Sequence, residues 1–120
     1  MAHHEWIETG GKRILYLNIA SHSIEEVTRK ISEFKQVIIA YPPESLLSIT
    51  DTEGGGYNVE MIKAVKEFTD FSKPYSQKAV VIGLSSAQKL VFDSIKMLSR
   101  RQDLVALNSR EEAIAFLLSE

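Results

Sequence analysis

Residues 46–58 read LLSITDTEGGGYN. Apolar and polar side chains alternate over residues 46–51, which is typical of a β-strand. Three glycines follow, and Asn58 then offers a helix N-cap ahead of apolar residues at helical spacing. A strand, a glycine loop and a helix in this order leave backbone N–H groups free at the helix N-terminus. They also let another group approach the main chain closely.

The alternation of strand and helix continues on both sides of this stretch. Further runs suit strands at residues 5–9, 13–20, 78–83 and 104–107. Capping boxes of the form Ser-x-x-Glu/Gln predict helix starts at Ser23, Ser85 and Ser109. Pro42 and Pro74 end the first two helices. We therefore predict an α/β fold with a mostly parallel five-stranded sheet and four helices, in the order ββαβαβαβα.

The spacing of apolar residues predicts which side of each helix is buried. In the helix after Ser85, the predicted inward residues are Ala87, Leu90, Val91, Ile95 and Leu98. In the last helix they are Ala113, Phe116 and Leu117. The apolar run at residues 37–39 keeps the helical spacing of the first helix, so we expect it to form the last turns of that helix rather than a strand.

Length and composition indicate one globular domain spanning residues 1–120, with residues 1–4 as a mobile terminus. Hydrophobic residues make up 44% and charged residues 25% of the chain, which is enough to build a core. The absence of cysteine excludes disulfides and thiolate metal sites, and a formal net charge of -2 argues against a nucleic-acid partner. Residues 1–20 contain no continuous apolar stretch, so we expect no signal peptide, no membrane insertion and a cytoplasmic protein.

Several short motifs occur along this element order: LSITD at 47–51, KPY at 73–75, VVIG at 80–83 and EEA at 111–113. In this arrangement the chain resembles small bacterial STAS-like proteins, single-domain relatives of the sporulation anti-sigma-factor antagonist SpoIIAA. The resemblance covers residues 5–118.

The resemblance implies a sheet whose strand-helix units wind in one direction, with all helices on one face. Leu47 and Ile49 would then face the helices, and Ser48 and Thr50 would share the opposite surface with Tyr16 and Asn18. A partly open sheet face could pair with another subunit, which makes a homodimer possible.

In the antagonists, a serine at the start of the helix after the middle strand is phosphorylated and switches partner binding. The matching position here is Asn58 or its neighbour Tyr57, and the Asp-Ser-Ser/Thr-Gly pattern is missing. The resemblance therefore implies a partner-binding module without that phosphoswitch.

The loops at residues 52–58 and 83–86 form the best site candidate, because they follow adjacent strands and lead into helix N-termini. The candidate residues for binding a ligand or partner are Asp51, Thr52, Gly54, Gly55, Gly56, Tyr57, Asn58, Ser85 and Ser86. Anions are favoured at such a place, but no Lys-Ser or Lys-Thr follows the glycines as a nucleotide loop of the Walker type requires. Turn and capping roles explain the same residues.

Catalytic and metal motifs are weak. Asp51 and Glu53 lie near a strand end with no base beside them, and solvated loop acids are the simpler interpretation. The sequence 83–87 (GLSSA) lacks the last glycine of a nucleophile elbow. His3, His4 and His22 lack the spacing of metal ligands. Arg100 and Arg101 most simply complement helix C-terminal carbonyls.

We therefore expect a non-catalytic, STAS-like regulatory or protein-interaction module with no cofactor. The alternative is a carrier of a small apolar or nucleotide-like molecule, and an enzyme ranks third.

Overall fold

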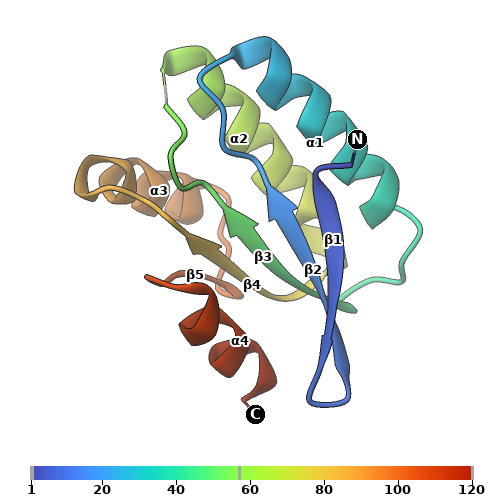
Figure 1. The fold of residues 1–120 in the computed structure, drawn as a ribbon. Coiled ribbons are helices and arrows are strands. Elements are labelled where there is room, and N and C mark those ends of the chain that lie inside the picture. Colours follow the sequence, from blue (N-terminus) through green and yellow to red (C-terminus); the bar gives the residue numbers. More distant parts are fainter. Residues whose placement is uncertain (1, 57, 120) are drawn as a thin grey trace.

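The computed structural model describes residues 2–56 and 58–119, which form a five-stranded sheet and four α-helices (Figure 1). The strands are β1 (His4–Thr9), β2 (Lys12–Asn18), β3 (Leu46–Asp51), β4 (Ser76–Ile82) and β5 (Leu104–Ala106). The helices are α1 (Ile24–Ile38), α2 (Val59–Ser72), α3 (Ser86–Leu98) and α4 (Arg110–Leu118), with a short 3-10 turn at Lys73–Tyr75. The predicted α/β class and element types are confirmed.

The strands lie in the sheet in the same order as in the sequence, β1-β2-β3-β4-β5. β1 is antiparallel to β2, and the other neighbours are parallel. Each of α1, α2 and α3 therefore carries the chain one strand along the sheet. This arrangement brings the carboxyl ends of the parallel strands to one edge.

Local capping explains where the helices begin. Ser85 and Gln88 form a reciprocal capping box, as predicted, and Asn58 caps α2 by accepting from the Met61 amide at 2.9 Å. Ser23 and Ser109 accept from the amides three residues on, but the glutamates of their boxes bond elsewhere. The run at 37–39 ends α1 as expected.

Helices cover both faces of the sheet, which corrects the expectation that all lie on one face. One face, here the three-helix face, carries Leu15 and Leu17 and packs against α1 and α2. Its continuation on β4 and β5 packs against Phe92 of α3. The other face, here the α4 face, buries Ile49 and Val80 against α4 (Figure 1). Because α4 leads to no further strand among the described residues, crossover handedness does not hold it on the side of the other helices.

The register of β3 also differs from the expectation. Ser48 pairs with Leu15 and Thr50 with Leu17, so both polar residues lie on the three-helix face. Leu47 and Ile49 lie on the α4 face with Tyr16. Both faces of this strand are covered, so polarity alone does not identify the face that the three helices cover.

α3 buries a narrower stripe than the sequence predicts. Leu90 and Leu98, both expected to point inward, are 72% and 69% exposed. Ile95 is buried, and Val91 and Phe92 are half-buried. α3 lies over the narrow end of the sheet, where β5 has three residues, so there is little strand surface for a wider stripe to cover. In α4, the predicted Ala113 and Leu117 are fully buried.

Candidate functional site

Three loops meet at the carboxyl ends of β2, β3 and β4. The Gly56 amide donates to the Ser21 carbonyl at 3.1 Å, which ties the glycine loop to the loop before α1. A Cβ on Gly55 would lie 3.0 Å from the Ser21 amide nitrogen, and one on Gly83 would lie 2.5 Å from that of Glu53. The two predicted loops are therefore neighbours, and these glycines allow the loops to touch.

The polar residues of the predicted site serve this loop junction. Asp51 accepts from the Glu53 amide at 2.9 Å and from the Tyr16 hydroxyl, and the Thr52 hydroxyl donates to the Ile82 carbonyl at 2.9 Å. Asn58 and Ser85 are helix caps, while Gly54 and Ser86 are exposed. The candidate Tyr57 lies outside the described residues. Turn and capping duties thus account for most of the polar groups that the sequence singled out.

A cavity of about 150 Å³ lies behind these loops, between the three-helix face and helices α2 and α3. Thr52, Gly55 and Gly56 line it on the loop side. Its walls are mainly apolar: Leu15, Leu17, Ala79 and Val81 from the sheet, Met61, Val65 and Phe68 from α2, and Val91, Phe92 and Ile95 from α3. A cavity of this size and lining holds one small ring such as benzene, whereas pockets for drug-sized ligands start at about 300 Å³.

Ser48 and Thr50 also line the cavity. Sequence reasoning placed them on the other face, so it missed them as site residues. The available signal was the alternation of apolar and polar residues along β3. When helices cover both faces of a sheet, the polar residues of such a strand must also lie under a helix.

Arg101 lines the cavity beside Ser72 and Ser76 and is 3% exposed. Its guanidinium donates to both carboxylate oxygens of Asp103, at 2.8 and 2.6 Å, and to the Thr69 carbonyl at 2.8 Å. Burial favours a higher pKa for Asp103, but the bonds from Arg101 and Ser76 outweigh it and hold that pKa below its usual value. Arg101 thus complements a C-terminal carbonyl of α2, which corrects the expectation that the Arg pair serves the end of the helix that it follows, α3.

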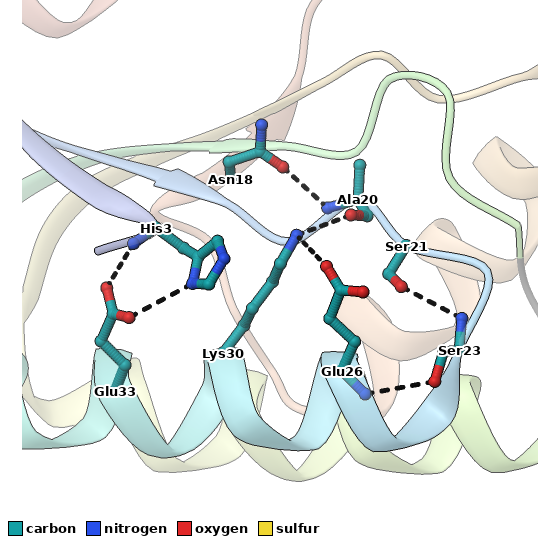
Figure 2. Close-up of polar contacts among 8 residues, drawn as sticks. All are labelled: His3, Asn18, Ala20, Ser21, Ser23, Glu26, Lys30 and Glu33. Atoms are coloured by element: carbon teal, nitrogen blue, oxygen red, sulfur yellow. Dashed lines mark hydrogen bonds and ion pairs between the residues drawn. The ribbon is translucent and has the colours of Figure 1, made fainter. Parts of the chain in front are cut away.

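Lys30 of α1 is a second buried cation, 4% exposed, which the sequence did not single out (Figure 2). Its ammonium donates to the Ala20 carbonyl at 2.7 Å and lies 3.5 Å from a Glu26 carboxylate oxygen. The Asn18 side chain accepts from the Ala20 amide at 3.1 Å. Both backbone polar groups of Ala20, in the loop before α1, are therefore held by side chains. The Glu26–Lys30 spacing of four residues was the available local signal.

The first residues of the described chain contact α1. The His3 amide donates to Glu33 at 2.8 Å, and the His4 ring nitrogen lies 2.5 Å from the same carboxylate oxygen. β1 begins at His4, one residue earlier than expected. Burial favours a higher pKa for Glu33, but the bonds from His4 and His3 outweigh it and keep that pKa below its usual value. Among residues 2–56 and 58–119, no group of three acidic or histidine side chains is arranged to hold a metal ion.

Tyr16 and Asp51 form a polar pair on the α4 face. Burial, together with the hydrogen bond and negative charge of Asp51, raises the pKa of Tyr16 to about 12. The Arg110 guanidinium lies 4.8 Å from the centre of the Tyr16 ring and 3.3 Å from Glu5. The Tyr16 hydroxyl therefore stays protonated to a higher pH than an ordinary tyrosine, and it donates a hydrogen bond to Asp51.

No protein-family model matches this chain, and no curated protein matches it significantly. Within the described part of the chain, no helix combines the length and apolar character needed to cross a membrane.

Proposed function

We propose that this protein binds a small, mainly apolar molecule in the cavity between the three-helix face and helices α2 and α3. The cavity itself carries the proposal. Its walls are mainly apolar, and moving an apolar molecule from water onto such walls gains about 25 cal/mol per Å² of apolar surface buried. A molecule that fills it gains contacts that the protein lacks when the cavity is empty.

The position of α3 supports an entry route. Ile95 is its one fully buried residue among those described, and Leu90, Met97 and Leu98 point to solvent. A helix held by so few buried side chains opens at lower free energy than the strands beneath it. Outward movement of α3 would expose Phe92 and the cavity wall to a ligand.

A thermal-shift titration with benzene, toluene and indole tests the proposal. The melting temperature of the wild type should rise with ligand concentration, because a ligand that binds the native state stabilises it. Val65→Phe, which fills the cavity from α2, should abolish the rise. Val105→Phe, a matched change on the α4 face, should retain it. Absence of any rise in the wild type at millimolar ligand would refute the proposal.

A second candidate is the STAS-like regulatory or interaction module, which the element order and the exposed apolar side chains of α3 support. Leu90, Met97 and Leu98 are 72%, 77% and 69% exposed, and a second copy of the chain is the simplest partner to test. Sedimentation velocity should show a dimer that Leu90→Ser with Met97→Ser dissociates. The protein should be measured over a 100-fold range of concentration, which covers about 2.7 kcal/mol of association free energy. A wild-type protein that stays monomeric over this whole range would contradict self-association.

A further inference from the structure

The sheet wall of the cavity is mainly apolar and carries three hydroxyls, those of Ser48, Thr50 and Ser76, of which the Ser76 hydroxyl donates to Asp103 at 2.6 Å. Ser48 pairs in register with Leu15 and Ala79, and Thr50 pairs with Leu17 and Val81. All six residues line the cavity. β3 is the central strand of the sheet, so the Ser48 and Thr50 hydroxyls face the middle of the wall rather than its edge.

Neither the Ser48 nor the Thr50 hydroxyl has a hydrogen-bond partner within residues 2–56 and 58–119. In the same part of the chain, every side-chain nitrogen or oxygen that is fully buried has a partner. The Thr69 hydroxyl on α2, for example, donates to the Val65 carbonyl at 2.8 Å. The Ser48 and Thr50 hydroxyls are thus left open toward the cavity, where a bound molecule can reach them.

The cavity offers little to a charged ligand. Arg101 is the one charged side chain among the described lining residues, and Asp103 already accepts from it through both oxygens. A carboxylate entering the cavity would lose its hydration without gaining an unpaired cation. A neutral molecule avoids that penalty.

Resting on the binding function proposed above, we propose that Ser48 and Thr50 select neutral, ring-sized ligands that carry one hydrogen-bonding group, the class represented by phenol. A hydroxyl brought into an apolar cavity without a partner is disfavoured relative to plain benzene, because it loses its bonds to water. The two side chains reverse that order by offering a donor and acceptors at the sheet wall. They are specificity-determining residues, and the apolar walls supply the affinity common to all such ligands.

Calorimetric titration of the folded protein with phenol, benzene and benzoate tests this selection. For the wild type we expect phenol to bind about tenfold tighter than benzene, as one good hydrogen bond allows, and benzoate to bind most weakly. Thr50→Val keeps the shape of the side chain and Ser48→Ala removes one oxygen. Together they should make benzene the tighter ligand while leaving its own affinity within about threefold of the wild-type value. Thr28→Val, on the exposed surface of α1, should change neither affinity.

The results separate this inference from the binding function itself. If benzene binds and phenol has no advantage, or if the advantage survives both substitutions, the selection by Ser48 and Thr50 is wrong and the binding function stands. Equal binding of benzoate and phenol would likewise overturn the neutral-ligand assignment. If none of the three compounds binds the wild type, both proposals fail. Ser48→Ala alone provides the same comparison should the double variant not fold.

Discussion

Gly83 lies so close to Glu53 that a Cβ on Gly83 would stand 2.5 Å from the Glu53 amide nitrogen. The backbone of Gly83 also has a φ of +86°, a conformation that other residues rarely adopt. The loops after β3 and β4 therefore pack against each other only while position 83 has no side chain.

Gly83→Ala should lower the free energy of unfolding by roughly 2 to 4 kcal/mol, from backbone strain and displacement of the Glu53 loop. Gly54→Ala is the matched control, because Gly54 has a φ of +81° but nothing within 4 Å of its added Cβ. It should lose only about 1 kcal/mol, the strain alone. Urea denaturation measures both, and equal losses would show that the loop contact is unimportant.

Lys30→Met should lower the free energy of unfolding by about 1 to 3 kcal/mol, because the Ala20 carbonyl loses the ammonium that donates to it. Methionine keeps most of the apolar stem, so the loss reports on the polar contact. Arg29→Met, one residue away on the exposed side of α1, should change the value by no more than about 0.5 kcal/mol. Denaturation of the two variants side by side decides, and indistinguishable midpoints would contradict the proposed role of Lys30.

Tyr16 should ionise near pH 12, about two units above an ordinary tyrosine. Its pKa is higher in the folded state than in the unfolded state, so its contribution to stability is complete below pH 10 and is lost as the pH rises toward 12. Ultraviolet titration of the wild type minus that of Tyr16→Phe isolates this group from the other tyrosines. A difference curve centred near pH 10 would show that Asp51 does not hold the proton on Tyr16.

Arg101→Met should be among the most damaging single substitutions, with a loss of roughly 3 to 5 kcal/mol, because it leaves the Asp103 carboxylate without its partner in a mostly buried place. Replacing both residues, with Arg101→Met and Asp103→Leu, should recover much of that loss. Urea denaturation of the single and double variants forms the comparison. A double variant no more stable than Arg101→Met would argue against an isolated charge as the cause.

The lowered pKa of Asp103 also predicts that the folded protein loses stability at acidic pH. The folded-state pKa of this carboxyl group lies below 3.8, so the group contributes stability that is present above that pH and is lost as the pH falls through its folded-state pKa. Asp103→Asn should flatten this part of the stability profile. Thermal melts between pH 2 and pH 6 test it, with Asp93→Asn on the exposed surface of α3 as the control. Identical profiles for wild type and Asp103→Asn would contradict the assignment.

The elements of this fold follow from local chemistry, which is why the sequence predicts them. Asn58 caps its helix through a residue three positions away, and Ser85 does the same with Gln88. The strand before Asn58 needs only alternation over six residues. Such signals lie within one turn of chain and do not depend on the remainder of the molecule.

Face and site depend on distant residues, so the sequence predicts them poorly. Ser48 lies under the helices because its register partner is Leu15, more than thirty positions earlier. The buried guanidinium of Arg101 finds a hydrogen-bond acceptor in the Thr69 carbonyl, which lies in α2, more than thirty positions earlier. Leu90 points outward because β5 is too short to provide a surface on which the whole apolar side of α3 could pack. Leu15, Thr69 and β5 are all distant in sequence from the residues whose positions they determine. The sequence pattern close to Ser48, Arg101 or Leu90 therefore does not indicate these contacts.

The placement of α4 has a consequence for synthesis on the ribosome. The α4 face buries Ile14 and Ile49 under Ala113 and Leu117, which belong to the last helix of the described chain. Since a chain emerges from its N-terminus and its early parts fold first, β1 to β4 can pair while this apolar surface still lacks its cover. A nascent or truncated chain without α4 therefore exposes an apolar surface that chaperones, proteases and other nascent chains can bind. This exposure ends only when α4 has left the ribosome and Ala113 and Leu117 pack on the sheet.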